Sequence, residues 1–488
     1  MADYDLAIIG GGLNGVSIAR DAVGRGLRVI LLEQGDLASA ASSATSRLIQ
    51  GDLLALERRR FLRVRAALGE RDVWLRCAPH LVRPMRFAIP AHSDERPPWL
   101  LRGGLLLYDR FASRSGLPRS AAIDITHHPI GNALKRPFGT AFEYSDCVVD
   151  DSRLVVLTAL DAAERGAVIR TGARCVRADR TDVWRLAVID RGLRLVITAR
   201  ALVNASGAWT ASVAETILHL PPPRATAMQA SQIIVRRLFE TDTIYVFQNS
   251  DRRLIFASPY EHDFTLIGTV AHPFRGDPAI ISAAAADVAY LCDAANRYFR
   301  EPVEPFDVVR TVSAANLVPE RGGRSGRDGA VMIEAPRGRA PLLTVFGGEV
   351  TTARLRAERA VSMLAPFYPM APRWTAFSPL PGGDFAWERF DAQVDAARER
   401  WRFLSAPQAQ RLVGAYGSRL AAVLGEAKSR ADLGPAFGPE LTGAEVRYLM
   451  TREWARFPDD VLWRRSKLGL TMPEADRQAL ATFMASPA

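Results

Sequence analysis

The sequence predicts a protein of the α/β class (α+β overall). A Rossmann-type dinucleotide-binding domain is interleaved with an antiparallel-sheet domain and followed by a C-terminal helical domain. Short apolar strands run into glycine turns near residues 5–15, 201–209 and 341–352, which indicates one nucleotide domain assembled from separated segments. Beyond residues 379–383, which read Pro-Leu-Pro-Gly-Gly, the apolar residues recur at helical spacing.

The first glycine turn predicts a phosphate-binding site. An apolar strand leads into it, and a second apolar strand, residues 28–33, ends in a carboxylate. Gly10 makes the tight turn, Gly12 lets backbone amides approach a pyrophosphate, and Gly15 allows close packing of helix on strand. The helix N-terminus adds its free N–H groups, and Glu33 is placed to accept hydrogen bonds from ribose hydroxyls. A glycine-rich turn without a ligand is the alternative, but every part sits at the offset that a dinucleotide site requires.

Two further features favour FAD over NAD. A hydroxyl-rich loop spans residues 35–49, where small side chains leave space for a flat ligand, and a late glycine turn follows residues 341–346. Together they would enclose an isoalloxazine ring, so we expect FAD as the cofactor. The residues expected to contact it are Gly10, Gly12, Gly15, Glu33, Ser42, Ser43, Thr45, Ser46, Gly207, Gly347, Gly348, Val350 and Thr351.

The same turns suggest the domain boundaries. The pieces between them show apolar residues with period two, as at residues 253–258, which is typical of an antiparallel sheet and indicates a substrate domain. The predicted domains are 1–80, 145–215 and 320–375 for FAD binding (discontinuous), 80–145 and 215–320 for substrate binding, and 376–488 for the C-terminal helical domain.

Composition narrows the class of protein. The net charge is +10, but the 63 basic residues include only three lysines and form no basic stripe with interleaved aromatics, so we expect no nucleic-acid partner. Attraction to an anionic membrane surface is the better interpretation of this charge. The four cysteines form no CxxC pair and the seven histidines lack ligand spacing, so we expect no metal. No secretory leader or spanning apolar run is evident, which predicts a cytoplasmic protein.

One segment suggests how the chain would meet a membrane. Residues 98–111 mix bulky apolar side chains with Trp, Tyr and Arg, and are too few to span a bilayer. An interfacial helix with aromatic anchors and cationic flanks fits this pattern. A core helix beneath the substrate domain is the alternative.

Further motifs extend over nearly the whole chain, at residues 142–147, 149–154, 204–209, 346–348, 380–383, 452–454 and 462–465. With the first glycine turn, they resemble the aerobic, FAD-dependent glycerol-3-phosphate dehydrogenases. The resemblance implies a flavoprotein on the inner face of the cytoplasmic membrane that oxidises sn-glycerol 3-phosphate to dihydroxyacetone phosphate and reduces quinone. The partners we expect are a small-molecule substrate, quinone or another electron acceptor, the membrane surface and, in a homodimer, a second copy of the chain.

The substrate side departs from the family pattern. Family His, Gly, Arg, Tyr and Lys positions are occupied here by Gln50, Asp52, Leu54, Ala55, Gln232, Asn316 and Glu349. A phosphate dianion is best bound by Arg or Lys, and alcohol oxidation needs a base near the carbinol hydroxyl. These exchanges remove the groups that would serve both needs.

Replacement residues can be suggested. For substrate binding we expect Arg327, which best matches a family arginine, with Gln50, Gln232, Asn316 and Arg310. As catalytic residues we expect Glu349, His262 and His272. Each has a structural alternative: Glu349 would cap the helix that follows it, and the two histidines would be exposed loop residues.

Three hypotheses for function remain open at this point. The chain oxidises glycerol 3-phosphate, as the family that it resembles does; or it is a divergent paralogue, serving a biosynthetic pathway, with a larger or less anionic substrate; or it is a flavin-binding pseudoenzyme that acts by interaction.

Overall fold

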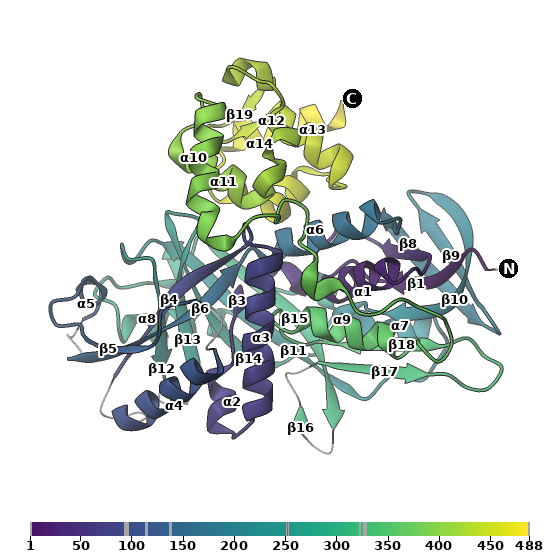
Figure 1. The fold of residues 1–488 in the computed structure, drawn as a ribbon, viewed down its shortest axis with the longest axis horizontal. Coiled ribbons are helices and arrows are strands. Elements are labelled where there is room, and N and C mark those ends of the chain that lie inside the picture. The colour runs from purple at the N-terminus through teal and green to yellow at the C-terminus, as the bar shows by residue number, and fades with distance from the viewer. Residues whose placement is uncertain are drawn as a thin grey trace.

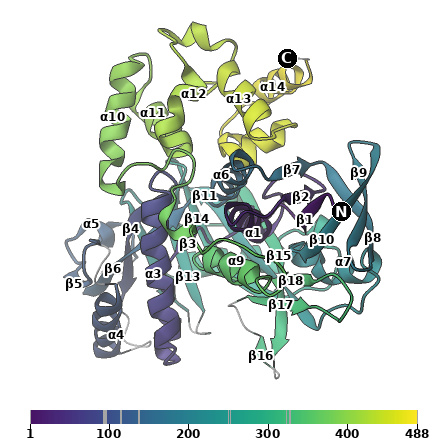
Figure 2. The same cartoon turned by 45° about the vertical axis from the view of Figure 1, so that its right-hand side comes forward.

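The computed structural model describes residues 2–91, 97–112, 116–135, 139–249, 251, 253–321, 324–325 and 329–486. Two large β-sheets with their covering helices form the body of the molecule, and the C-terminal helices form a separate unit at one end (Figure 1). In the view turned by 45°, helices α1 and α9 lie side by side next to the strands of the first sheet (Figure 2).

The first sheet carries the three glycine turns. Its strands lie in the order β17-β18-β10-β1-β2-β7, with the β8–β9 hairpin extending from β10. The pairs β10–β18, β1–β10, β1–β2 and β2–β7 are parallel. Because β1, β10 and β18 are parallel neighbours, the turns that follow them meet at one edge of the sheet. The bounds are β1 Tyr4–Ile9, β2 Val29–Glu33, β7 Val168–Thr171, β8 Ala173–Arg180, β9 Trp184–Asp190, β10 Leu193–Asn204, β17 Ala330–Glu334 and β18 Leu342–Phe346.

Strand β1 is apolar and buried from Leu6 to Ile9 because both of its faces are covered there. Leu6 and Ile8 belong to the core beneath α1 (Leu13–Gly24), α6 (Asp151–Glu164) and α9 (Ala353–Ser362). Ala7 and Ile9 belong to a second core on the opposite face, where the β8–β9 hairpin and α7 (Thr210–Thr216) pack. The run without polar residues therefore follows from the layering.

The second sheet is mostly antiparallel. Its order is β16-β15-β11-β14-β13-β12-β4-β6-β3, with β5 beside β6, and β12–β4 is a parallel pair. Helix α8 (Ala285–Asn296) packs on β11 and β14. The bounds are β3 Leu48–Ile49, β4 Val82–Pro90, β5 Ala121–Asp124, β6 Thr140–Val149, β11 Ala225–Arg236, β12 Thr243–Gln248, β13 Leu254–Tyr260, β14 Phe264–Pro273, β15 Arg310–Arg321 and β16 Arg324–Ser325.

Three helices lie at the outer end of the second sheet: α2 (Leu53–Glu57), α3 (Phe61–Cys77) and α4 (Pro98–Phe111). Helix α4 contacts α2 and α3 (Figure 1). Only Leu105 and Tyr108 of α4 are buried. Within the described residues, every helix is too short or too polar to cross a bilayer.

The C-terminal unit has its own apolar core. Its helices are α10 Phe390–Arg400, α11 Ala406–Tyr416, α12 Leu420–Leu424, α13 Gly443–Arg452 and α14 Glu474–Ala485, with a π-helix η9 over Asp460–Arg465. It is held to α6 by a buried bidentate pair between Arg153 and Glu453. Arg465 of η9 pairs with Asp36, which follows β2.

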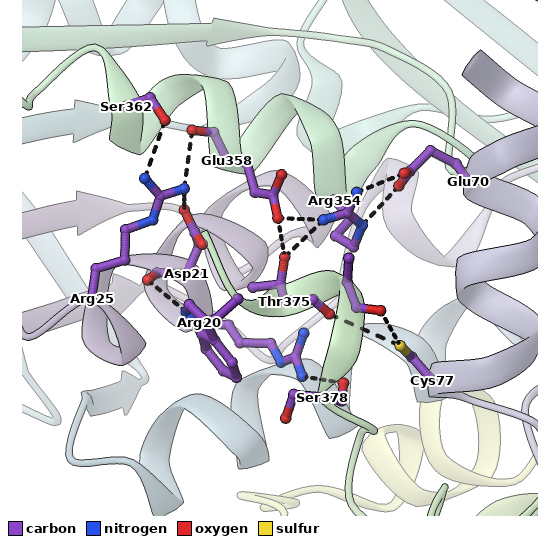
Figure 3. A network of polar contacts seen from close by, with 12 residues as sticks. Arg20, Asp21, Arg25, Glu70, Cys77, Arg354, Glu358, Ser362, Thr375 and Ser378 are labelled. Atoms are coloured by element: carbon purple, nitrogen blue, oxygen red, sulfur yellow. Dashed lines mark hydrogen bonds and ion pairs between the residues drawn. The ribbon is translucent and has the colours of Figure 1, made fainter. Parts of the chain in front are cut away.

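A buried polar network holds the helices of the nucleotide domain together (Figure 3). Arg354 of α9 donates both guanidinium edges to carboxylates: Nε and Nη2 bind Glu70 of α3 at 2.8 and 2.6 Å, and Nη1 binds Glu358. Thr375 donates to Glu358 at 2.7 Å. Removing one partner of such a buried pair typically costs about 3–5 kcal/mol, so the network fixes the relative positions of α3 and α9.

Candidate flavin site and active site

The first glycine turn is shaped by contacts that exclude side chains. Gly10 has φ +114°, and a Cβ there would lie 2.5 Å from the carbonyl oxygen of Ala205. A Cβ on Gly15 would lie 1.9 Å from the carbonyl oxygen of Gly10. Gly12 caps α1 without a side chain of its own, and the N–H groups at a helix N-terminus favour an anion.

Glu33 lies against this turn. Its carboxylate accepts hydrogen bonds from the N–H groups of Gly11 and Gly35, both at 2.7 Å. Burial raises the pKa of the Glu33 carboxyl, while these backbone hydrogen bonds oppose the shift. The carboxylate is therefore fixed at the end of β2, beside the helix N-terminus.

The hydroxyl-rich loop reaches the same helix end. Ser42 Oγ accepts a hydrogen bond from the Leu13 N–H at 3.0 Å, and Ser43 Oγ donates to the Ala40 carbonyl at 3.0 Å. Thr45 faces away and donates to Asp151 at 2.8 Å. Ser46 is exposed. The four predicted loop residues therefore have different surroundings, and Ser42 is the one in contact with α1.

The other two turns complete the edge. Gly207 follows β10 with φ +60°, and Gly347 and Gly348 follow β18 with φ +40° and +100°. Asn14 of α1 donates to the Gly347 carbonyl at 3.1 Å, which ties the first turn to the last. A Cβ on Gly348 would lie 2.1 Å from a guanidinium nitrogen of Arg356, so a side chain there would displace that guanidinium, and the positive φ is strained for any residue but glycine.

Arg356 is a functional candidate that sequence reasoning missed. It is buried and donates to Asn14 Oδ1 at 2.8 Å and to the Glu349 carbonyl at 3.2 Å. Burial lowers the pKa of Arg356 to about 10. Among the described residues, no carboxylate lies within ion-pair distance of it, so its charge reaches the glycine turn uncancelled by a direct partner.

Glu349 does not stand alone at the last turn. Its carboxylate pairs with Arg63 of α3 at 3.0 Å, and the same guanidinium pairs with Asp52 at 3.1 Å. Arg63 was not foreseen; its only signal was that Asp52 and Glu349 are both acidic departures from the family pattern. Arg63 therefore joins two carboxylates at this turn.

The three predicted amides have different surroundings. The Gln50 N–H donates to Thr351 Oγ1 at 3.1 Å, which places Gln50 beside the last turn, where Val350 packs into the main core. Gln232 Nε2 donates to the Thr45 carbonyl at 2.9 Å. Asn316 is exposed on β15, opposite Met228.

The remaining candidates lie elsewhere. His262 is exposed in the turn between β13 and β14 with φ +61°. His272, at the far end of β14, pairs with Asp287 at 3.0 Å, and this hydrogen bond raises the pKa of His272. Arg310 stacks on Trp463 of the C-terminal unit, 3.6 Å from its ring centroid. Arg327 lies outside the described residues. The three catalytic candidates are therefore not gathered by any hydrogen bond among the described residues.

The glycine edge fits FAD on its own geometry. A helix N-terminus capped by a glycine suits the pyrophosphate, and the Glu33 carboxylate suits ribose hydroxyls. A model of the FAD dependent oxidoreductase family matches residues 5–355, and a model of the C-terminal domain of alpha-glycerophosphate oxidase matches residues 374–486. The protein is an FAD-dependent oxidoreductase, and the predicted cofactor is confirmed.

Sequence relatives show which family of FAD-dependent oxidoreductases the chain belongs to. A glycerol-3-phosphate dehydrogenase of Pseudomonas aeruginosa is 42% identical, with 99% of this chain and 95% of the relative covered. The aerobic glycerol-3-phosphate dehydrogenase of Escherichia coli is 39% identical, with 98% and 96% covered. The D-erythritol 1-phosphate dehydrogenase of Brucella abortus is also 39% identical, with 98% and 97% covered. The chain belongs to the aerobic FAD-dependent glycerol-3-phosphate dehydrogenase family.

A solved structure agrees with the fold. The glycerol-3-phosphate dehydrogenase of Bacillus halodurans, complexed with FAD, is 23% identical and superposes with a TM-score of 0.78, covering 99% of this chain and 90% of that one. The predicted fold class is confirmed. The individual site residues stay predictions.

Proposed function

We propose that this protein oxidises a hydroxyl-bearing substrate by hydride transfer to N5 of FAD, and that the substrate carries less negative charge at the flavin turn than sn-glycerol 3-phosphate does. The charge balance around Glu349 is the observation that supports the proposal. Bound FAD supplies the hydride acceptor; the chain's residues bind the substrate, orient it and take its proton.

The charge balance disfavours a phosphate dianion at this turn. Arg63 is shared by Asp52 and Glu349, so its guanidinium already has two carboxylate partners. The nearby predicted substrate residues, Gln50 and Gln232, are neutral amides. Phosphate recognition relies on charge-assisted donors that are not already neutralised. A neutral polyol segment suits amides and carboxylates better.

Glu349 is the base we propose. Its side chain is 32% exposed and pairs with Arg63, and an adjacent guanidinium favours the ionised carboxylate that a base requires. The carboxylate would accept the proton of the substrate hydroxyl while the carbon that bears this hydroxyl gives its hydride to N5 of FAD. A structural role, in which Glu349 only fixes the start of α9, is the competing explanation. His262 and His272 remain less favoured candidates.

Sequence identity does not fix the substrate. The relatives named for glycerol 3-phosphate and for D-erythritol 1-phosphate are similar to this chain to nearly the same degree, at 39–42% identity. The family reaction, oxidation of sn-glycerol 3-phosphate to dihydroxyacetone phosphate, is therefore the first alternative. A flavin-binding pseudoenzyme is the second.

An anaerobic reduction assay distinguishes the three. Oxidised holoenzyme is mixed with sn-glycerol 3-phosphate, D-erythritol 1-phosphate and a panel of uncharged polyols, and bleaching of the flavin absorbance is followed. We expect faster bleaching by a member of the uncharged panel than by either phosphate. Fastest bleaching by sn-glycerol 3-phosphate would support the family reaction. Bleaching by dithionite alone would support the pseudoenzyme.

The variant Glu349→Lys tests the charge argument directly. It replaces a carboxylate by a cation and leaves Arg63 to Asp52, so we expect reduction by sn-glycerol 3-phosphate to become at least about 10-fold faster. Glu349→Gln is the matched control, because it removes the negative charge without adding a cation, and its gain should be smaller. If neither variant gains, Glu349 does not exclude the phosphate.

We also propose that the surface around α4 binds an anionic membrane. Trp99 is 74% exposed and Leu62, at the start of α3, is 84% exposed, while Phe61 and Phe111 pack together nearby. Exposed arginines flank these side chains, at Arg58, Arg59, Arg60, Arg102 and Arg110. Exposed aromatic and aliphatic side chains with basic neighbours are typical of interfacial attachment.

Vesicle sedimentation tests this surface. The double variant Leu62→Glu, Trp99→Glu should bind anionic vesicles at least about 10-fold more weakly. It removes apolar side chains that would insert into the membrane, and it adds negative charges that the anionic lipids repel. Ile280→Glu is the control, because Ile280 is 81% exposed on another part of the molecule. Equal binding by both variants and by the parent would refute the assignment.

A further inference from the structure

A cavity of about 430 Å³ lies where the flavin loop, the second sheet and the C-terminal unit meet. Loop residues 39–44 form one wall, the first part of β15 forms another, and residues 459–470 close the third. The aromatic side chains on its walls are Trp209, Tyr260 and Trp463. The cavity has no part in the charge cluster around Glu349.

The cationic side chains that line this cavity differ in their hydrogen-bond and ion-pair partners. Arg464 pairs with Asp36 and Asp460, and Lys467 donates to Ser152 at 2.8 Å and to the Trp463 carbonyl at 2.8 Å. Arg310 is different: within the described part of the chain its side chain has neither a hydrogen bond nor an ion pair, and its guanidinium carbon lies 3.6 Å from the ring centroid of Trp463.

A stacked guanidinium keeps its edge free. The indole ring covers one face of Arg310 at 3.6 Å and holds the side chain in one orientation. The N–H donors in the guanidinium plane stay available, and their fork geometry matches a carboxylate or a phosphate in two parallel hydrogen bonds. The hydroxyl groups of Ser39, Thr311 and Ser313 line the same cavity and offer further hydrogen bonds.

We propose that this cavity is an anion subsite for the substrate, in which Arg310 binds a phosphate or carboxylate group that lies remote from the oxidised hydroxyl. The inference rests on the proposed function: the flavin turn takes the neutral part of the substrate, and the anionic end extends to Arg310. The substrate is then longer than glycerol 3-phosphate and carries its anionic group at the far end from the oxidised hydroxyl, and such a compound should bleach the flavin faster than any uncharged polyol of the panel.

Asp459 allows a second test of the subsite, because its charge should act on a bound anion in the direction opposite to that of Arg310. It lines the same cavity and acts electrostatically on Arg310, without an ion pair between the two in the described residues. A bound anion is attracted by Arg310 and repelled by Asp459. Removing each charge must therefore change anion affinity in opposite directions, which a loss of folding cannot imitate.

Isothermal titration calorimetry on the FAD-loaded protein measures the subsite, with inorganic phosphate and succinate as probes. Arg310→Met should weaken binding of at least one probe about 10- to 100-fold, and Asp459→Asn should tighten it about 2- to 5-fold. Arg275→Met is the matched control, because Arg275 is exposed and does not line the cavity. No binding by the parent, or equal affinities in the parent and Arg310→Met, would overturn the proposal.

The FAD content of Arg310→Met shows whether Arg310 binds the anionic group of the substrate or the pyrophosphate of FAD. If Arg310 serves the FAD pyrophosphate instead, Arg310→Met will lose FAD and keep its affinity for the probes, which also overturns the proposal. The proposed function fails by a different readout, the order of flavin bleaching by the substrate panel. Probe binding in a protein that is bleached fastest by sn-glycerol 3-phosphate would show an anion subsite without the substrate assignment.

Discussion

Gly15→Ala is the sharpest test of the flavin-binding turn. The added Cβ would lie 1.9 Å from the carbonyl oxygen of Gly10, and Cβ contacts below 3.0 Å essentially do not occur, so helix α1 must move away from β1 by at least 1.1 Å. Because the opposing atom belongs to the backbone, no side-chain rotation relieves the contact. Overpacking of this kind typically costs about 1–3 kcal/mol of stability.

The displacement acts on FAD more strongly than on the fold. The N–H groups at the start of α1 move with the helix, and a shift of this size takes them out of hydrogen-bond range of a pyrophosphate. Hydrogen bonds to a charged group contribute about 1.5–3 kcal/mol each. Loss of one already predicts FAD binding weaker by about 10- to 100-fold.

The assay compares Gly15→Ala with Gly69→Ala. Both are the same chemical change inside a helix, but a Cβ on Gly69 of α3 has no atom within 4 Å, so that change should stabilise the protein by up to about 1 kcal/mol. FAD content after purification and FAD affinity on reconstitution are measured for both. Full FAD occupancy in Gly15→Ala, with unchanged affinity, would refute the account of this turn.

Two further predictions concern buried charges. Glu453→Gln leaves Arg153 buried without a carboxylate partner, which should lower the free energy of unfolding by about 3–5 kcal/mol. Glu426→Gln breaks an exposed pair and should lower it by less than about 1 kcal/mol. Thermal and urea unfolding of both variants measure the difference. Burial outweighs the Arg25 ion pair and raises the pKa of Asp21 from 3.8 to about 6. The folded state therefore binds the proton more tightly than the unfolded state, so the stability that Asp21 contributes is full below about pH 4 and is lost as pH rises through about 6. Urea unfolding across this window should show a shallower pH dependence in Asp21→Asn, and an unchanged slope would contradict it.

The parts of the site set by local sequence were predictable. Gly10, Gly15 and Glu33 lie within one strand–helix–strand unit, so their spacing alone determines their geometry. The two later turns could be joined to it because each follows an apolar strand, and parallel strands place their carboxyl ends together.

The parts set by long-range contacts were not predictable. Glu349 is 286 residues from its partner Arg63, and no periodicity links positions that far apart. Residues 459–470, within the C-terminal stretch where apolar residues recur at helical spacing, form π-helix η9 followed by a short 3₁₀ turn, Leu468–Leu470. The widened turn lets Ser466 N–H bind the Val461 carbonyl at 3.0 Å, while Arg465 reaches Asp36; a pairing with a residue so distant leaves no mark on helical spacing.

The anion subsite and the docking of the C-terminal unit depend on the same contacts. Trp463, the platform for Arg310, lies in η9 directly before residues that bind the nucleotide domain: Arg464 and Arg465 pair with Asp36, and Lys467 binds Ser152. If Glu453→Gln loosens this unit, the platform moves although Glu453 does not line the cavity. Phosphate affinity should then fall together with stability in Glu453→Gln and stay at the parent value in Glu426→Gln. Undiminished phosphate binding in a destabilised Glu453→Gln protein would show that Trp463 does not orient Arg310, and the subsite would have to be assigned without the C-terminal unit.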